Sequence, residues 1–575
     1  TLGPHSFYWF KLEAATAVPG RAAEEATLPA LETDGPWEQV LSRGAKSALE
    51  RILPHYLQSC RWFGGKARKL RAVTLNDPVG IPVNSHEAQI AALEVLYGEG
   101  EPESYLLPLM FLPAERAAEL QQAFPQAVIA RLRAKHNGDP VDGLLVDAIY
   151  DRGFGKALLD AISRRRNFKG RVTEFTALSS TGFRALRGSS HAPLEPAIIR
   201  KEQSNTSIVY GDRLILKIFR RLNEGVNPDL EIGRFLSEKT NFEHAPKLGG
   251  SLELHRANRG PSTIGILQSW IRNEGDAWQY TLDHLADFFE CYGALTGTQQ
   301  AELYPPGGHV IDFVGREVPG AVRGCIGAYL TSAALLGRRT AEFHVALASD
   351  PQDPNFAAEP FTPFYRRAAY QSMRTVADRA LMALRDRVKQ LPDEVRPEGE
   401  RLLSLKNEIF NRFRSMVEQK MTGLRIRGHG DYHLGQVLFT GKDFVITDFE
   451  GEPGQPIGER RSKRSPMRDV ASMLRSFNYA ALTALRTRDF RAEDAARMAN
   501  AASCWGFWVS LVFLQDYVEV GRGGGFLPAS KQELKTVLDL YLLQKAVYEL
   551  NYELNNRPEW VAVPIRGILQ LMGAA

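Results

Sequence analysis

The residues with the clearest chemical potential lie in one stretch, Gly428–Pro453, which reads GHGDYHLGQVLFTGKDFVITDFEGEP. Two apolar runs flank the turn Thr440–Asp443, and this pattern predicts a β-hairpin between residues 436 and 449. Closing that hairpin brings Gln436 and Asp448 to the same end. The stretch therefore places an amide oxygen beside a carboxylate.

Asp431 lies five residues before Gln436, in a loop that contains Gly and His. Two carboxylates and one amide oxygen can converge there, and hard oxygen ligands of this kind suit Mg²⁺. Phosphoryl transfer requires such a set, because the protein must orient an attacking hydroxyl and hold metal ions beside nucleotide phosphates. We assign Asp431 as the acceptor of the hydroxyl proton and Gln436 and Asp448 as metal ligands. The alternative is a polar turn with a surface Asp on each side.

The stretch resembles the aminoglycoside phosphotransferase and protein-kinase-like superfamily. The superfamily motifs HGDxHxxN and D-[FL]-[ED] correspond here to HGDYHLGQ and DFE. Gln436 stands where Asn is usual, but Gln is expected in the maltokinase branch, and HGDYHLGQVL with DFEGEP resembles maltokinase. Glu450 replaces the Gly of the protein-kinase DFG and adds an acidic group near the metals. We expect His429 and His433 to brace the loop rather than bind a metal.

The resemblance implies a nucleotide site earlier in the chain. Lys217 in RLILKIFRRL occupies the strand position of the cation that contacts the nucleotide phosphates, and Glu231 on the following helix is its expected partner. Taken alone, either residue is typical of a surface, but their order along the chain supports the assignment. Maltokinases carry a similar polar turn before this strand, able to donate to phosphate oxygens; here it consists of Ser204, Asn205, Thr206 and Ser207.

Two other segments carry recognisable motifs. The segment Ser465–Phe477 opens with Ser and Pro, which predicts a helix N-terminus. By analogy with kinase-like folds, Asp469 near its start braces the catalytic loop; helix capping or solvation is the alternative. GFGK at Gly153–Lys156 lacks the spacing and hydroxyl of a Walker loop, so we interpret it as a helix start.

Three further phrases resemble maltokinase: RWFGGKAR at Arg61–Arg68, LGRRTAEFHVAL at Leu336–Leu347, and YELNYELNNRPEWVAVPI near the C-terminus. Sugar binding needs planar polar groups and aromatic faces. The resemblance implies that the last phrase lines a maltose pocket, with Arg557 as the first choice. The expected pocket residues are Tyr548, Glu549, Tyr552, Arg557 and Trp560. The alternative is a terminal helix that packs its aromatic side chains into the core.

The elements predict an α+β fold, and the resemblance implies the bilobal protein-kinase-like plan of the aminoglycoside phosphotransferases. Residues 37–169 are expected to form an N-terminal α+β cap, with a helix ending near Cys60 followed by strands. Residues 170–272 read as the nucleotide-binding lobe, a sheet with one inserted helix. Residues 273–575 are mainly helical and hold the catalytic loop and sugar site.

Residues 1–13 resemble the closing strand of the C-terminal β-domain of amylase-family trehalose synthases, which are sometimes fused to a maltokinase. Residues 14–36 lack periodicity and are rich in Ala, Glu, Pro and Gly, which predicts a linker. We hypothesise that the chain is the kinase part of such a fusion or works beside such a partner. The resemblance implies the reaction of ATP with the anomeric hydroxyl of maltose to give maltose 1-phosphate, feeding α-glucan (glycogen) synthesis from trehalose.

Two rivals stay open: a kinase for another sugar or amino sugar such as glucosamine, and a non-catalytic kinase-fold binding module. Composition fits a soluble multidomain protein, with 44% hydrophobic and 24% charged residues over 575 positions. A net charge of +4 gives no reason to expect a nucleic-acid partner. We interpret the basic run Arg460–Arg464 as a solvated loop rather than a docking site.

Four scattered cysteines indicate a reduced, cytoplasmic compartment without disulfides. The longest apolar run, Ala501–Leu514, is shorter than the roughly 20 residues that span a bilayer, so it predicts a buried helix and no membrane partner.

Overall fold

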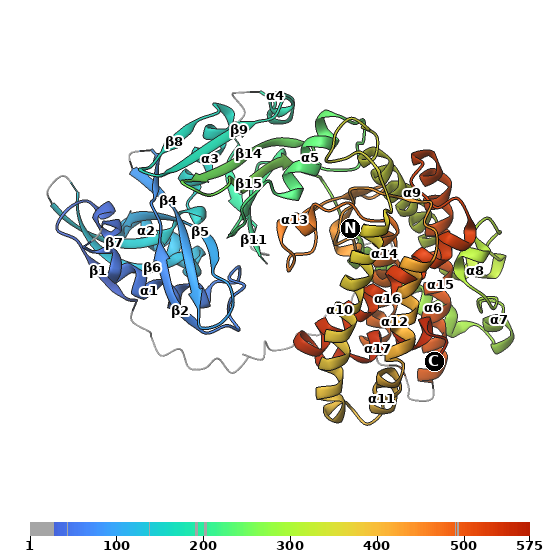
Figure 1. Cartoon of the computed structure of the whole chain (residues 1–575). Helices are drawn as coiled ribbons and strands as arrows, with labels where there is room; N and C mark the ends of the chain where they lie inside the picture. Colours follow the sequence, from blue (N-terminus) through green and yellow to red (C-terminus); the bar gives the residue numbers. More distant parts are fainter. Residues whose placement is uncertain are drawn as a thin grey trace, which may run out of the picture. The chain divides into compact units, whose positions relative to one another are not determined.

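The computed structural model describes residues 28–574 except for residues 43, 85, 137–138, 190–193, 200–203, 489 and 491–493. The expected tail, residues 1–13, lies outside the described residues. The chain divides into two compact units, residues 1–157 and 158–575 (Figure 1). The division falls inside helix α3, before the boundary expected at residue 169.

The first unit is built on one sheet with the strand order β1-β6-β7-β5-β4-β2, and β3 pairs with β4. Its strands are β1 (Ala30–Glu32), β2 (Leu70–Leu75), β3 (Val79–Val83), β4 (His86–Tyr97), β5 (Glu103–Pro113), β6 (Val128–His136) and β7 (Asp139–Asp147). Its helices are α1 (Lys46–Ser59), α2 (Ala114–Ala123) and the beginning of α3 (Arg152–Ser163). Strand β1 lies within the range expected to be a linker, and it pairs in parallel with β6.

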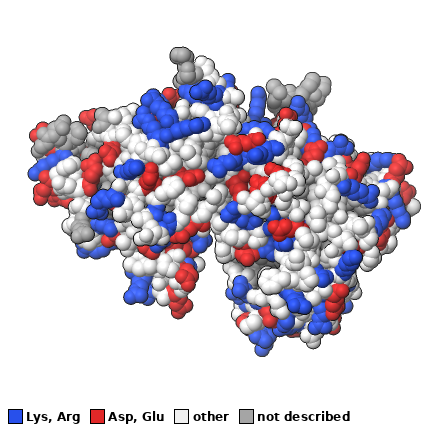
Figure 2. Space-filling view, turned by 45° about the horizontal axis from the view of Figure 1, so that its top comes forward, with Lys and Arg blue, Asp and Glu red and all other residues white. Residues whose placement is uncertain are grey.

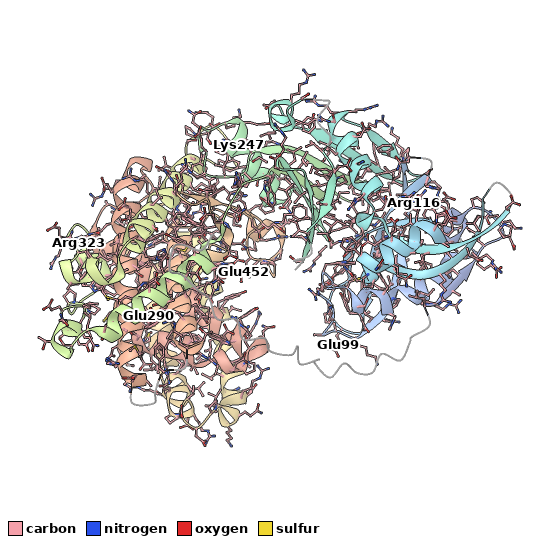
Figure 3. All side chains as sticks on the ribbon, turned by 180° about the vertical axis from the view of Figure 1, so that it is seen from behind. Glu99, Arg116, Lys247, Glu290, Arg323 and Glu452 are labelled. Carbon is pink, nitrogen blue, oxygen red and sulfur yellow. The ribbon has the colours of Figure 1, made fainter. Side chains whose placement is uncertain are left out.

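The core of this unit forms between the sheet and α1. The helix buries Leu49, Leu53 and Leu57 along one face, the spacing of an amphipathic helix. The phrase RWFGGKAR follows directly and packs inward, because the rings of Trp62 and Phe63 lie 6.0 and 5.1 Å from the ring of Tyr105. Figure 3 labels Arg116 of α2, whose guanidinium pairs with Asp151 at 3.0 Å just before α3.

The second unit begins with an antiparallel sheet of order β10-β11-β12-β15-β14-β9-β8. Its strands are β8 (Asn167–Lys169), β9 (Thr173–Ser179), β10 (Pro196–Ile198), β11 (Asn205–Tyr210), β12 (Leu214–Phe219), β14 (Leu248–Arg256) and β15 (Ser262–Ser269); β13 (Arg221–Leu222) follows β12. Helix α5 (Pro228–Glu238) is inserted between the strands and packs on β14 and β15, and α4 (Phe183–Arg187) is a single turn. This part is the expected sheet with one inserted long helix.

The remainder is mainly helical. Its helices are α6 (Ala277–Ala294), α7 (Gly297–Ala301), α8 (Gly320–Ile326), α9 (Tyr329–Leu347), α10 (Pro363–Arg387), α11 (Arg396–Ser404), α12 (Lys406–Glu418), α13 (Ile457–Arg460), α14 (Met467–Arg486), α15 (Ala495–Gly521), α16 (Lys531–Asn556) and α17 (Ala562–Leu571). Two small sheets interrupt them. One contains β16 (Gly275–Asp276), β19 (Val437–Phe439) and β20 (Phe444–Ile446), and the other pairs β17 (Glu359–Pro360) with β18 (Leu424–Arg425).

Helix α15 is the buried helix that the apolar run predicted, and it packs along α9. The two backbones approach so closely that a Cβ on Gly337 would lie 2.1 Å from the carbonyl oxygen of Phe513. Any larger residue at position 337 would therefore separate the helices. Among the described residues, no helix is both long and apolar enough to cross a membrane. Cys60, Cys291, Cys325 and Cys504 are free thiols, as expected.

The basic run Arg460–Arg464 is not the solvated loop that was expected. Lys463 is buried and donates to the Pro354 carbonyl oxygen and to Glu359, both at 2.7 Å. Arg461 pairs with a glutamate on α5, so the run folds against acidic groups that are distant in the sequence. On the face shown in Figure 2, basic and acidic side chains are interspersed.

Candidate active site

The hairpin β19–β20 forms as expected. The Thr440 amide donates to the Asp443 carbonyl oxygen at 2.9 Å, which closes the turn. Arg339 of α9 holds the Asp443 carboxylate with two hydrogen bonds, at 2.9 and 2.8 Å. At the open end, the Thr447 amide donates to the Gln436 carbonyl oxygen at 2.9 Å. Gln436 therefore lies beside the residue that precedes Asp448, as the spacing indicated.

Asp448 lies at the centre of the polar cluster. Its φ of 66° is left-handed, a strained conformation for a residue with a Cβ, and such strain is concentrated at functional sites. The Gln436 side chain lowers the pKa of its carboxylate. The ammonium group of Lys217 on β12 contacts three carboxylates: Asp448, Glu450 at 2.5 Å and Asp229 at 3.3 Å. The cluster therefore joins the sheet, α5 and the segment after β20.

The three carboxylates outnumber the single ammonium group. One oxygen from each of Asp229, Asp448 and Glu450 lies within 4.8 Å of the others. Burial, together with the charge of Asp448, raises the pKa of Asp229 and of Glu450 despite the nearby lysine. Burial also opposes ionisation of Asp448, but Lys217 outweighs it, so the pKa of Asp448 lies below its usual value. The negative excess and the hard oxygen donors fit Mg²⁺.

Glu231 does not pair with Lys217, contrary to expectation. Its carboxylate contacts Arg461 at 2.6 and 3.0 Å and Arg427 at 2.8 Å. The carboxylate beside Lys217 is Asp229, two residues earlier on α5. Residues two apart on a helix point to different faces, so only one of the two can reach Lys217. The sequence DLE offers both carboxylates and does not say which one faces the strand.

The residues expected to form a polar turn, Ser204–Ser207, instead begin strand β11, where Asn205, Thr206 and Ser207 pair with β12. Asn205 donates to Glu450 at 2.8 Å, so this side chain reaches the carboxylate cluster. The buried Thr206 instead accepts a hydrogen bond from Arg220 at 2.9 Å, which indicates a structural role. Ser204 is exposed, and Ser207 lies opposite Lys217 in the β11–β12 register.

Asp469 of α14 holds the backbone of the catalytic loop. This buried carboxylate accepts from the amides of His429 at 2.7 Å and Gly430 at 3.0 Å, and from His344 of α9 at 3.2 Å. Burial raises the pKa of Asp469, but the hydrogen bond and charge of His344 outweigh burial and lower it to about 2. Asp469 therefore bonds to the loop backbone, and its carboxylate does not cap its own helix.

Both histidines of the HGDYH phrase form hydrogen bonds within this region. The His429 ring bonds the Thr447 carbonyl oxygen at 2.9 Å, joining the loop to the hairpin. The His433 ring accepts from the Gly435 amide at 3.1 Å. Among the described residues, the only cluster with metal-ligand geometry consists of carboxylates, without a histidine. These contacts are those of bracing residues.

Asp431 lies between two basic side chains. His433 lies 4.0 Å from one carboxylate oxygen, and the ammonium group of Lys545 on α16 lies 4.0 Å from the other. The Asp431 side chain is 24% exposed, so a substrate hydroxyl can reach it. Lys545 was not anticipated, because a single lysine in a long helix gives no signal in the sequence.

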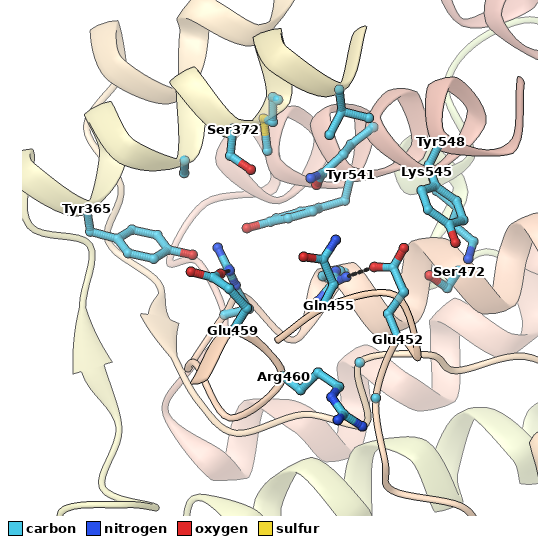
Figure 4. Close-up of a pocket in the computed structure, with 18 residues that line it drawn as sticks. Tyr365, Ser372, Glu452, Gln455, Glu459, Arg460, Ser472, Tyr541, Lys545 and Tyr548 are labelled. Atoms are coloured by element: carbon cyan, nitrogen blue, oxygen red, sulfur yellow. Dashed lines mark hydrogen bonds and ion pairs between the residues drawn. The ribbon is translucent and has the colours of Figure 1, made fainter. Parts of the chain in front are cut away.

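A pocket opens beside this loop (Figure 4). Gly430, Gly451 and Glu452 line it from the loops, and Lys545 and Tyr548 line it from α16. Glu452 pairs with Arg468 of α14 at 3.1 Å, the contact dashed in Figure 4; Figure 3 shows the same residue in the helical part of the chain. The other polar and aromatic residues that line the pocket include Tyr365, Gln455, Glu459, Arg460, Arg464, Tyr541 and Gln544.

The five residues expected to bind maltose do not all face this pocket. Tyr548 lines it, and burial and the neighbouring Glu452 raise the pKa of its hydroxyl. Glu549 is instead buried in an ion pair with Arg475, at 2.9 and 2.5 Å. The other three residues do not line the pocket. Arg557 pairs with Glu553 at 2.6 Å, and Tyr552 is 44% exposed. The Trp560 ring lies 4.3 Å from the guanidinium of Arg486.

The antiparallel sheet, the helical region and the carboxylate cluster between them define a kinase-type phosphotransferase. A family model described as the maltokinase N-terminal cap domain matches residues 56–151, so the first unit contains that cap. A glucosamine kinase of Mycolicibacterium smegmatis is 23% identical over 418 residues, which cover 72% of this chain and 86% of the relative. A glucosamine kinase of Streptacidiphilus jiangxiensis is 24% identical over 391 residues, covering 68% and 76%.

The fold has a solved counterpart. A structure of glucosamine kinase in complex with glucosamine, ADP and inorganic phosphate matches with a TM-score of 0.57 and 19% identity, covering 94% of this chain and 100% of the other. The predicted α+β fold, with an N-terminal cap and a helical C-terminal region, is therefore confirmed.

Proposed function

We propose that this protein transfers the γ-phosphoryl group of ATP to the anomeric hydroxyl of maltose, giving ADP and maltose 1-phosphate. The observation that carries the proposal is the position of Asp431. Lys545, which contacts Asp431, lines the pocket, and the loop that bears Asp431 is joined through His429 to the hairpin that ends at Asp448. An acceptor hydroxyl and a nucleotide can therefore approach Asp431 from two sides.

The residues divide the work as follows. Asp431 accepts the hydroxyl proton, while Lys217, Asn205 and the hydroxyls of Ser204 and Ser207 contact nucleotide phosphates. Thr206 supports the start of β11 through Arg220. Asp448, Gln436 and Glu450 would hold Mg²⁺, which when bound neutralises charge on the phosphate oxygens. Positioning and charge neutralisation then account for catalysis, without a covalent enzyme intermediate.

The charges in the pocket favour a neutral acceptor. Four cationic side chains line it, Arg460, Arg464, Arg468 and Lys545, against two carboxylates. Both carboxylates are already paired, Glu452 with Arg468 and Glu459 with Arg464. An acceptor that carries an ammonium group would meet repulsion without a free carboxylate in the lining. The relatives named glucosamine kinase nevertheless make glucosamine the second candidate.

The length of the pocket favours a disaccharide. Tyr541 and Tyr548 both line it, and seven residues of helix separate them by about 10 Å. Two sugar rings can lie along that distance with an aromatic side chain near each end. The resemblance of residues 1–13 to a trehalose synthase supports a source of maltose in a fused or associated partner, with the product entering α-glucan synthesis.

The test is coupled ADP release with Mg²⁺-ATP and, separately, maltose, glucose, glucosamine and an aminoglycoside, followed by NMR of the product. We expect turnover on maltose with phosphate on C1. Turnover on glucosamine alone would retain the kinase and reject the acceptor. ADP release with none of the four acceptors above the acceptor-free rate would reject both.

A further inference from the structure

Helix α5 presents two carboxylates to different neighbours. Asp229 contacts Lys217, as described above, and accepts from the Phe449 amide at 3.3 Å. Glu231 faces the other way, and its carboxylate bridges Arg427 and Arg461. The Glu231 side chain is 11% exposed and that of Arg427 only 3% exposed, so this pair is almost completely removed from water, whereas the Arg461 side chain is 32% exposed.

The two arginines belong to the segments that build the acceptor side. Arg427 directly precedes Gly428, the first residue of the catalytic loop. Arg461 directly follows α13, whose Arg460 lines the pocket and donates to the Glu450 carbonyl oxygen at 3.2 Å. Arg427 also donates to the Arg461 carbonyl oxygen at 2.5 Å, so the segments are bound to each other as well as to Glu231.

The Glu231 carboxylate offsets the burial of the Arg427 charge. Burial lowers the pKa of the Arg427 guanidinium, which shows how strongly the site disfavours an unpaired charge. Glu231 is the acidic group that raises that pKa back towards its usual value. Without the carboxylate, two guanidinium groups would face each other at close range, and the segments that carry them would move apart.

We propose that Glu231 is a positioning residue for the acceptor side of the site: it fixes the start of the catalytic loop and the end of α13 relative to α5, and it does not act on the nucleotide. The proposal rests on the proposed function, because it assigns the pocket beside α13 to the acceptor. It also divides the roles on α5, with Asp229 serving Lys217 and Glu231 serving Asp431 and the pocket.

The kinetic test compares Glu231→Gln with the matched variant Asp229→Asn on the same helix. For Glu231→Gln we expect kcat to fall and the acceptor KM to rise, each about 10-fold, with the ATP KM changed less than about 2-fold. For Asp229→Asn we expect the larger rise in the ATP KM. Glu231→Asp, whose shorter side chain reaches one arginine, should recover part of the loss. If Glu231→Gln and Asp229→Asn raised the ATP KM equally, the proposal would be overturned.

A second arm does not depend on the identity of the acceptor. Hydrogen exchange of the ligand-free Glu231→Gln protein should become faster in residues 426–432 and 457–464, and should stay unchanged in 205–219 and in α15. Arg461→Gln, which leaves the Arg427–Glu231 pair in place, should give a smaller change in the same residues. The double variant should show no change beyond that of Glu231→Gln, because Glu231→Gln already removes both pairs. Faster exchange confined to 205–219, or no change anywhere, would overturn the proposal. If no sugar is phosphorylated, this arm still decides the role of Glu231.

Discussion

The catalytic hairpin and helix α16 were both expected to carry functional residues. The residues expected at the hairpin lie together in the structure, whereas those expected on α16 do not. At the hairpin, Asp448 and Glu450 contact the lysine that the sequence had placed on a distant strand, and Gln436 lowers the pKa of Asp448. On α16, a run of polar and aromatic residues spreads around the helix, and only Tyr548 among the five expected positions lines the pocket.

The difference follows from geometry. A two-stranded hairpin with a short turn forces the residues at its open end together, so spacing alone predicts which side chains meet. A helix turns through about 100° per residue, and a dense run of polar residues therefore faces several neighbours. For α16, the composition indicates a binding surface but does not say which of its residues face the ligand.

The largest expected effect tests the hairpin side of this comparison. Asp431→Asn removes the proton acceptor while keeping the size of the side chain, so kcat should fall about 10³-fold. Nucleotide binding should remain within about 2-fold of the original, because Asp431 is separate from the Lys217 cluster. Steady-state ADP release and titration calorimetry with ATP measure the two quantities. A variant that keeps more than one tenth of the activity would remove Asp431 from its assigned role.

Glu549→Gln tests the α16 side. The change leaves Arg475, itself buried, without a charged partner, and breaking a buried ion pair typically costs about 3 kcal/mol. We expect the free energy of unfolding to fall by roughly that amount in denaturant titrations. The acceptor KM should stay unchanged. A raised acceptor KM with full stability would instead place Glu549 at the sugar.

The support beneath the loop predicts a pH dependence. The pKa of Asp469 is lowered to about 2 in the folded protein, against about 3.9 for an unfolded Asp. A lowered folded pKa stabilises the fold above the unfolded value, and this contribution disappears as the pH falls from about 4 towards 2. At pH 7 the ionised group contributes about 2.6 kcal/mol. The stability difference between the original protein and Asp469→Asn should therefore shrink below about pH 4; a difference that grows on acidification would contradict the assignment.

Much of this architecture could be predicted from the sequence, because it depends on short-range patterns. The hairpin turn, the helix beginning at Pro228 and the buried apolar run of α15 each follow from patterns within a few residues. Strand β14 is not apparent in the sequence, because its Gly249-Gly250 start weakens the strand pattern. The cap was expected to begin at residue 37, but the structure begins earlier, with β1. The local sequence does not predict this strand, because it is stabilised by pairing with the distant β6.

The site was predicted where the chain itself brings residues together and missed where packing decides. Asp229 and Glu231 are equivalent in sequence, and only the orientation of α5 assigns one to Lys217 and the other to the arginines. The phrase LGRRTAEFHVAL gave no roles, yet Arg339 holds the hairpin turn and His344 holds Asp469. Lys545 and the pairing of Arg460–Arg464 depend on contacts between distant segments, which a single sequence does not encode in any local pattern.

The smallest expected effect also compares two residues of the same type on α16. Tyr548 lines the pocket beside Glu452, whereas Tyr552, one helical turn later, is 44% exposed. Tyr548→Ala should raise the acceptor KM about 10-fold, because the sugar loses an aromatic face and Glu452 loses a neighbour that orients it; a 10-fold change corresponds to about 1.4 kcal/mol. Tyr552→Ala should change the KM by less than about 2-fold. Equal effects from both variants would mean that the sugar extends along α16 towards Arg557, which would restore the surface first inferred from the sequence.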